Sequence, residues 1–417
     1  MLVVQKYGGS SLQGPDRIRQ VAERVLHTRR GGHEVVVVCS AMGDTSDELI
    51  DLAEKVSGRR PAREMDMLLS SGERVSNALM AMAIHDLGGT SHSLSGAQAG
   101  VFTDSNHGGA DIVDVVPDRV RELLDRGSIP LVAGFQGVCR ETGDTTTLGR
   151  GGSDVTAVAL AAALRADRCE IFTDVDGVYS ADPRLVPRAR LLETVSHAEM
   201  LEMAATGAKV LMPRCVEYAR RHDVDIHVRS SFTDHPGTLV SNGTRDTSGE
   251  GSSVTGVTHT RSIAKITVTD FPAELPAMAH VLDVLAAVGT PVDILRNLSG
   301  PQRSEVTFTV PDTDGPRALL LLEQHRTRIG YGRVRCDTDV GQVSLVGAAI
   351  RGGAGVMATL RRTLADAGVA VPSVSTSEIR VSALCHTAQL DHAVRALHHG
   401  LGLDSTTDAV VHAGTGR

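Results

Sequence analysis

Short apolar runs alternate with stretches of helical periodicity through about the first 230 residues of the chain. The run Glu34–Cys39 is almost continuously β-branched, which predicts a strand covered on both faces. In Pro15–Arg30 the apolar positions recur at helical spacing and predict a helix with one buried face. The same reasoning predicts strands at Met1–Gln5, Ser128–Phe135 and Arg168–Thr173, and helices at Met65–Leu87, Val155–Ala166, 197–206 and 213–221. This alternation predicts an α/β fold with a mainly parallel sheet between layers of helices.

The pattern changes after a polar, glycine-rich stretch at 241–253, which predicts a linker. Beyond it, a strand-helix-strand pattern occurs twice, with a period of roughly 78 residues. Its strands are predicted at Ala264–Val268 and Val292–Leu295, then at Gln342–Gly347 and Val371–Ser375. We therefore predict a domain at 1–240, the linker, and two small β-α-β-β-α-β units at 254–335 and 336–417. Two interpretations of this pair stay open, an oligomerisation module and a pair of effector-binding units.

Two glycine-rich loops follow predicted strands and carry cations. The first, Lys6-Tyr7-Gly8-Gly9-Ser10-Ser11, comes directly after the first strand, and α/β folds hold phosphates at such strand ends. Lys6 beside two glycines fits phosphoryl transfer, which needs charge neutralisation more than covalent help from the protein. The second, Leu148–Thr156, contains Arg150, whose guanidinium can hold a carboxylate through two hydrogen bonds. Its Ser153-Asp154 pair predicts the N-cap of the next helix, where unpaired N–H groups suit an anion.

Composition excludes several classes of function. The net charge is −8, aromatic residues make up 2% of the chain and Trp is absent, so nucleic acid is not an expected partner. The sequence lacks a Walker A loop and the Rossmann fingerprint, which argues against P-loop and nicotinamide sites. Six scattered cysteines in mostly apolar runs predict buried, reduced thiols. With no signal peptide and no apolar run of membrane-spanning length, we expect a cytoplasmic protein without a membrane partner.

Four motifs, in this order, resemble those of the aspartate kinases. They are Lys6–Ser11, Ser71-Gly72-Glu73-Arg74, Leu148–Asp154 and Thr173–Arg184. The C-terminal pair resembles the two ACT domains of that family, including Ser375–Arg380, and only the tail His412–Arg417 adds nothing to the resemblance. The resemblance implies the amino-acid-kinase fold, a three-layer sandwich with a mainly parallel sheet, followed by two ferredoxin-like ACT units.

The resemblance also implies a reaction. It is the ATP-dependent phosphorylation of the L-aspartate β-carboxylate to 4-phospho-L-aspartate, the first step of the pathway to aspartate-family amino acids such as lysine and threonine. Lys6 and Asp154 would be catalytic. Glu73 would receive the substrate ammonium and Arg150 a carboxylate, and the full aspartate site would comprise Ser40, Ser46, Glu73, Arg150, Gly151, Gly152 and Ser153. The nucleotide site would comprise Lys6, Gly8, Gly9, Ser10, Thr173, Asp174, Tyr179, Arg184 and Lys209.

Two partners follow from the same resemblance. Mg²⁺ would arrive with ATP and be held mostly by phosphates and water, so no protein ligand is predicted for it. The ACT domains would assemble the chain into a homodimer or a higher homo-oligomer.

Some positions depart from the family pattern. Ser46 stands where relatives usually have Thr, and the hydroxyl survives. In the ACT units, polar side chains and backbone donors of the kind that hold amino-acid effectors are lost at Ala273, Pro276, Ala277, Pro291, Ala370 and Pro372. We therefore expect feedback inhibition by lysine plus threonine to be weak or lost.

Two alternatives to an aspartate kinase stay open, a kinase of another small carboxylate and a non-catalytic amino-acid sensor. His398 and His399, at a helix end, are expected at the surface.

Overall fold

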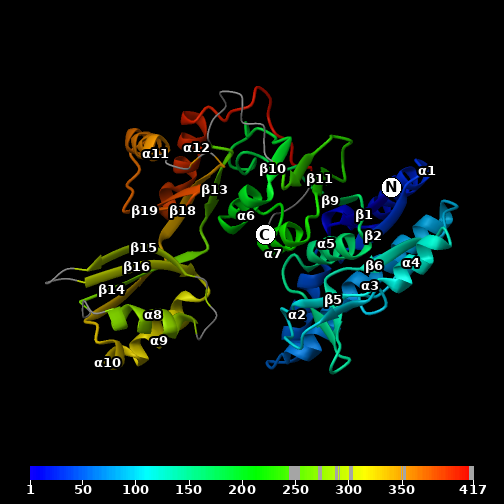
Figure 1. Ribbon diagram of the computed structural model, residues 1–417, viewed down its shortest axis with the longest axis horizontal. Coiled ribbons are helices and arrows are strands. Elements are labelled where there is room, and N and C mark those ends of the chain that lie inside the picture. Colours follow the sequence, from blue (N-terminus) through cyan, green and yellow to red (C-terminus); the bar gives the residue numbers. More distant parts are fainter. Residues whose placement is uncertain are drawn as a thin grey trace.

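The computed structural model describes residues 1–243, 254–270, 275–286, 290, 292–299, 304–348, 350 and 354–412, with the backbone alone described for 275–278, 294–299 and 304. Most of the predicted linker, from 244 to 253, lies outside these residues. An α/β domain forms one side of the molecule and two smaller units form the other (Figure 1).

The α/β domain is built on a sheet of eight strands in the order β10-β12-β11-β9-β1-β2-β6-β3. Every neighbouring pair is parallel except β11 with β12. The predicted mainly parallel sheet is therefore confirmed. Its strands are β1 (Leu2–Tyr7), β2 (Glu34–Cys39), β3 (Ser91–Leu94), β6 (Ile129–Ala133), β9 (Arg168–Thr173), β10 (Thr194–Ser196), β11 (Ile226–Ser230) and β12 (Thr238–Ser241).

Helices cover both faces of this sheet and make a three-layer sandwich. Alternate side chains of β2 enter different cores: Val35 and Val37 pack with the helices of one face, and Val36 and Val38 pack with those of the other. The first core holds side chains of α1 (Pro15–Arg30) and α3 (Ala62–Asp86), and α2 (Thr45–Val56) packs on α3. The second core holds side chains of α4 (Asp118–Asp125), α5 (Gly152–Leu164), α6 (His197–Ala205) and α7 (Pro213–His222).

A second, smaller sheet of the α/β domain was not predicted. Its order is β5-β4-β7-β8, with β4 (Val101–Thr103), β5 (Ile112–Val115), β7 (Gln136–Cys139) and β8 (Thr145–Thr147). Strands of three or four residues are too short for a two-residue alternation to stand out in the sequence.

The two C-terminal units are four-stranded sheets carrying helices. The first has the order β15-β16-β14-β17 and comprises β14 (Ile263–Thr269), α8 (Leu275–Ala286), β15 (Asp293–Ser299), β16 (Ser304–Pro311), α9 (Gly315–Gln324), α10 (Arg326–Ile329) and β17 (Arg333–Asp337). The second has the order β13-β18-β20-β19 and comprises β13 (Gly256–Thr260), β18 (Val340–Val346), α11 (Ala354–Asp366), β19 (Ser373–Thr376), β20 (Arg380–His386) and α12 (Leu390–Gly400).

The sheets divide the C-terminal part differently from the predicted boundary between 335 and 336. After that boundary the chain supplies three strands of the second sheet, and its fourth, β13, comes from the region assigned to the first unit. β13 runs antiparallel to β18, with Gly256 opposite Val346. In the sequence, the first unit therefore stands between β13 and the other three strands of the second sheet. It does so because the strand that pairs with the outer edge of β18 comes from an earlier part of the chain.

Two buried features bear on the sequence predictions. All six cysteines are free, and all are buried except Cys336, which is half-buried. The prediction that His398 lies at the surface is wrong: its side chain is fully buried, whereas His399 is exposed. His398 Nε2 lies 2.8 Å from Ser180 Oγ, and this distant partner satisfies the buried imidazole. No helix in the described part of the chain is long and apolar enough to cross a membrane.

Candidate active site

The candidate site lies where β9, β1, β2 and β6, four adjacent parallel strands, end at the same edge of the sheet. The loops that follow β1 and β2 are tied together, because Ser40 N–H donates to Tyr7 O at 3.1 Å and Gly43 N–H donates to Gly9 O at 3.0 Å. The amides of Gly9 and Ser10 donate to no acceptor within the described chain. Two donors that point at no protein group suit an anionic ligand at this edge.

The centre of this edge is an ion pair between Lys6 and Asp154. Lys6 Nζ lies 2.6 Å from Asp154 Oδ1, and the two side chains are only 12% and 9% exposed. A pair so poorly hydrated is screened less than a surface pair, so the carboxylate holds the ammonium in place. The structure thus brings together the two residues predicted to be catalytic.

The glycine-rich loop before α5 has a different helix start from the predicted one. Gly151 adopts the left-handed conformation, with φ of 68°, and a Cβ there would lie 2.1 Å from Met212 Cγ. Gly151 is therefore the N-cap, and the helix begins at Gly152. The prediction that Ser153-Asp154 caps the helix is wrong. Both residues lie in the first turn, and the Asp154 carboxylate is used by Lys6 instead.

Arg150, just before this turn, is exposed and forms no hydrogen bond or ion pair with the described residues. Ser153 is buried beside it at the start of α5. An unpaired guanidinium next to the free end of a helix provides two sources of positive potential. This corner therefore suits a carboxylate ligand.

Glu73 lies on α3 with 3% of its surface exposed. Its Oε1 accepts a hydrogen bond from Ala41 N–H at 3.2 Å, but its buried Oε2 has no partner among the described residues. Burial raises the pKa of Glu73 to about 7, although the Ala41 hydrogen bond opposes the shift. A buried carboxylate with one oxygen that lacks a hydrogen-bond partner is suited to binding a cationic ligand.

The loop after β2 lies against the same part of α3. Gly72 packs so closely on it that a Cβ would lie 3.0 Å from Ala41 Cβ, which explains a glycine inside a long helix. Ser40 accepts a hydrogen bond from Ser76 Oγ at its carbonyl oxygen, at 2.6 Å. Ser46 is half-buried in the first turn of α2. The structure therefore gathers the predicted acceptor residues Ser40, Ser46 and Glu73 around one loop.

Four of the predicted nucleotide residues lie at the end of β9 and in the loop after it, namely Thr173, Asp174, Tyr179 and Arg184. Asp174 Oδ2 pairs with the Arg184 guanidinium at 3.2 Å, and Thr173 Oγ1 donates to Asp174 Oδ1 at 3.0 Å. Tyr179 and Arg184 line one cavity together with Lys209, which comes from the turn after α6. Two segments of the α/β domain thus meet at one cavity, and part of its wall is Val257–His259 of β13.

Comparison with known proteins decides the family. A model of the amino acid kinase family matches residues 1–230, and a model of the ACT domain matches residues 343–401. The aspartokinase of Mycolicibacterium smegmatis is 55% identical over 419 residues that cover 100% of both chains. The chain belongs to the aspartokinase family.

Further relatives agree with this membership. The aspartokinase of Corynebacterium glutamicum is 53% identical over 100% of both chains. Escherichia coli aspartokinase III in complex with aspartate and ADP matches with a TM-score of 0.82 and 25% identity, over 96% of this chain and 100% of that one. The predicted family, the amino-acid-kinase fold and the ACT domain are therefore confirmed.

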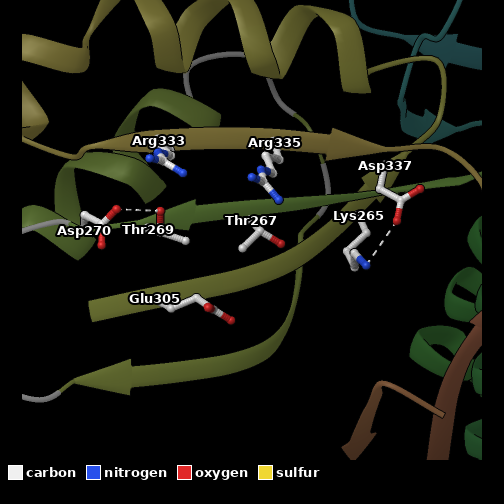
Figure 2. Close-up of a pocket in the computed structure, with 8 residues that line it drawn as sticks. All are labelled: Lys265, Thr267, Thr269, Asp270, Glu305, Arg333, Arg335 and Asp337. Carbon is white, nitrogen blue, oxygen red and sulfur yellow. Dashed lines mark hydrogen bonds and ion pairs between the residues drawn. The ribbon is translucent and has the colours of Figure 1, made fainter. Parts of the chain in front are cut away.

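A separate polar cavity lies on the first ACT unit of this aspartokinase-family chain (Figure 2). In β14, alternate residues are buried against the helices, which leaves Lys265, Thr267 and Thr269 on the opposite face. Figure 2 shows Arg333 and Arg335 of β17 beside this row and Glu305 of β16 across from it. The face thus carries both signs of charge and lies outside the kinase domain.

Some residues that shape the site were not predicted. Phe135, two residues after the end of β6, has a φ of 68°, which is strained for a residue with a side chain. Its N–H donates to Thr156 Oγ1 at 3.1 Å, and its carbonyl accepts from Leu148 N–H at 2.8 Å, so it fixes both ends of the glycine-rich loop.

The contact between Asp176 and His412 was also not predicted from the sequence. A carboxylate two residues after Asp174 was a visible signal, but nothing in the sequence linked it to the C-terminus.

Proposed function

We propose that the chain transfers the γ-phosphoryl group of ATP to the β-carboxylate of L-aspartate and forms 4-phospho-L-aspartate. The observation that carries this proposal is the poorly exposed Lys6–Asp154 pair at the strand-end edge, where Glu73 of α3 contacts the loop after β2 and Asp174 and Arg184 lie in the loop after β9. Membership of the aspartokinase family supports it, as does the likeness to a structure described as a complex with aspartate and ADP.

Lys6 has the central role in this mechanism. Charge spreads over the oxygens of the phosphoryl group during transfer, and a preorganised cation stabilises that charge. Asp154 holds the ammonium in position at 2.6 Å. The amides of Gly9 and Ser10 would donate to phosphate oxygens. Gly8 N–H already donates to Phe172 O at 3.3 Å, so Gly8 would contribute its lack of a side chain next to Lys6. No general base is needed, because the β-carboxylate of aspartate is already ionised at neutral pH.

The acceptor would bind through both of its charged ends. The ammonium of L-aspartate would meet the unused Oε2 of Glu73, and its α-carboxylate would meet the Arg150 guanidinium. Ser40, Ser46 and Ser153, with the backbone of Gly151 and Gly152, would complete the pocket and leave the β-carboxylate facing Lys6.

The nucleotide would bind on the opposite side, held by Thr173, Asp174, Tyr179, Arg184 and Lys209. We propose that Mg²⁺ arrives on the ATP phosphates. Asp154 is engaged by Lys6, and Asp174 by Arg184 and Thr173, so these carboxylates already have partners. A hard dication that keeps its water shell and binds phosphates suits such a site, and when bound it would neutralise phosphate charge.

Release of ADP, coupled to a spectroscopic readout, tests this proposal. We expect turnover with ATP, Mg²⁺ and L-aspartate and little turnover with L-glutamate or without an acceptor. Faster turnover with another small carboxylate would support the alternative of a sister kinase. Binding of aspartate without ADP release would support the alternative of an amino-acid sensor.

We also propose that the chain assembles into a homodimer or a higher homo-oligomer through its ACT units, in the cytoplasm. The mixed charges of the β14 and β17 face support self-association, because a second copy turned by a two-fold rotation can oppose Arg333 and Arg335 with acidic residues (Figure 2). The six free cysteines fit a reducing compartment. Light scattering of the full chain tests the assembly, and a doubly reversed R333E/R335E variant should form fewer oligomers. A monomeric wild type would contradict the proposal.

A further inference from the structure

The C-terminal segment Asp404–His412 leaves the second ACT unit and returns to the kinase domain (Figure 1). It lies along the loop between β9 and β10 and is fixed to it by backbone hydrogen bonds. Ser405 N–H donates to Arg188 O and Ala409 N–H donates to Pro187 O, each at 2.7 Å. Further along, Val411 forms an antiparallel bridge with Val175. The tail therefore follows the loop back to the end of β9.

The last described residue of the tail, His412, contacts this loop through both its backbone and its side chain. Its N–H donates to the carbonyl oxygen of Asp174 at 3.0 Å, and its Nε2 lies 3.0 Å from Asp176 Oδ1. The imidazole stacks on Phe232, with ring centroids 5.7 Å apart and planes 10° from parallel. Thr233 Oγ1 donates to the same oxygen of Asp176 at 2.7 Å. Asp176 is thus held by two contacts to the same oxygen, one from Thr233 and one from His412.

The loop held by His412 is long and irregular, since it connects Thr173 with Thr194 through turns and isolated bridges. Loops of this length without helices or strands depend on outside contacts for a single conformation. Asp174 presents its side chain to Arg184, while its backbone carbonyl accepts from His412. The tail therefore contacts the backbone of the same residue whose carboxylate is proposed to take part in the nucleotide site.

We propose that His412 is a positioning residue of the nucleotide site, and that the C-terminal segment Asp404–His412 is part of that site's architecture. This inference rests on the proposed nucleotide role of Asp174 and Arg184. His412 holds Asp174–Asp176 in the conformation that presents Asp174 to Arg184. Loss of the imidazole lets Asp174–Asp176 move. Binding of ATP then has to order this segment, so the affinity for ATP falls.

The test compares steady-state kinetics of the full-length His412→Ala variant with those of the wild type. We expect a rise in KM for ATP of about tenfold, which is the usual effect of losing a hydrogen bond to a charged group. The dissociation constant of ADP should rise by the same factor, while kcat and the KM for aspartate stay within about twofold of the wild type. His412→Gln, which can keep the hydrogen bond to Asp176, should restore most of the ATP affinity.

Two further variants make the result decisive. His386→Ala removes a similar pair, in which His386 Nε2 lies 2.7 Å from Asp339 on the second ACT unit, and it should leave both KM values unchanged. Arg184→Ala tests the nucleotide site itself. Normal ATP affinity in Arg184→Ala would overturn the site assignment. Lost ATP affinity in Arg184→Ala but not in His412→Ala would overturn the role of His412 alone.

A general structural role for His412 predicts a different outcome. It predicts equal changes in kcat and both KM values, without rescue by glutamine, and that result would also overturn the proposal. Should His412→Ala fail to fold, Asp176→Asn removes the charge of the partner carboxylate and keeps the tail intact. The same selective rise in KM for ATP is then expected, and an unchanged KM would count against the inference.

Discussion

The buried carboxylate of Glu73 gives a prediction whose size follows from the structure. Burial raises the pKa of Glu73 from 4.5 to about 7. This difference corresponds to about 3 kcal/mol, because one pH unit is worth about 1.4 kcal/mol. Since the pKa is higher in the folded state, the stabilisation from proton binding is complete below pH 4.5 and is lost as the pH rises through 7. The folded protein thus bears the cost of an ionised, desolvated carboxylate at pH 8.

Glu73→Gln removes the charge and keeps the acceptor for Ala41 N–H. We expect the variant to be more stable than the wild type at pH 8, and the gap to widen by about 2 kcal/mol between pH 5.5 and pH 8. For a domain of this size, about 1 kcal/mol corresponds to a shift of about 2–4 °C in the melting temperature. The same variant should lose most of its affinity for aspartate, because its amide has no charge to pair with the ammonium. Stability would rise as function falls.

Thermal unfolding of both proteins at several pH values, with and without L-aspartate, measures these effects. Glu122→Gln is the control, because Glu122 is an exposed glutamate on α4 that pairs with Arg119 on the surface. We expect no pH-dependent gap for the control. Saturating aspartate should stabilise the wild type and not Glu73→Gln. A gap between Glu73→Gln and the wild type that does not change with pH, or an unchanged KM for aspartate, would refute this reasoning.

Three further predictions concern catalysis and regulation. Lys6→Ala should lower kcat by about 10²-fold or more in a folded protein, because the developing phosphoryl charge loses its cation; near-normal turnover would remove Lys6 from that role. Arg150→Lys keeps the charge and loses the two-pronged geometry, so the KM for aspartate should rise far more than the KM for ATP, and the reverse pattern would assign Arg150 to the nucleotide. Lysine and threonine, titrated singly and together against initial rates, should inhibit weakly, since losing two hydrogen bonds to a charged effector weakens binding by about 10²-fold or more. Strong inhibition by lysine and threonine together at sub-millimolar concentrations would contradict this expectation. The expectation rests on Ala370 and Pro372 and on four residues whose side chains the structure does not describe, Ala273, Pro276, Ala277 and Pro291.

The sequence predicted those elements whose signals are local. Helix Pro15–Arg30 has the predicted bounds, because a proline stands in its first turn, a glycine follows its last residue and its apolar face repeats regularly. Strand Glu34–Cys39 also has the predicted bounds, since an unbroken β-branched run has no good alternative in an α/β domain. The strand-end loops, which carry most of the candidate site, follow directly from these elements.

The features that the sequence did not predict depend on partners far away in the chain. Asp154 looked like a helix cap by its local pattern, but Lys6 of β1, far away in the sequence, pairs with its carboxylate. His398 looked like a surface residue, but Ser180 and Asp404 provide it with buried polar contacts, and its burial lowers its pKa. β13 pairs with β18 although the whole first ACT unit separates the two strands in the sequence. A repeat period does not indicate that a strand of one unit precedes the other unit.

The position of β13 also limits the order in which the chain can fold. During synthesis, the kinase domain and β13 leave the ribosome before the first ACT unit, and the partner of β13 follows only after that unit is complete. Until then β13 is an unpaired strand, and such edges recruit other chains. A recombinant fragment that starts after Thr260 would expose the matching edge of β18. A fragment that contains only the two C-terminal units should therefore begin before Val254, so that the second sheet contains all four of its strands.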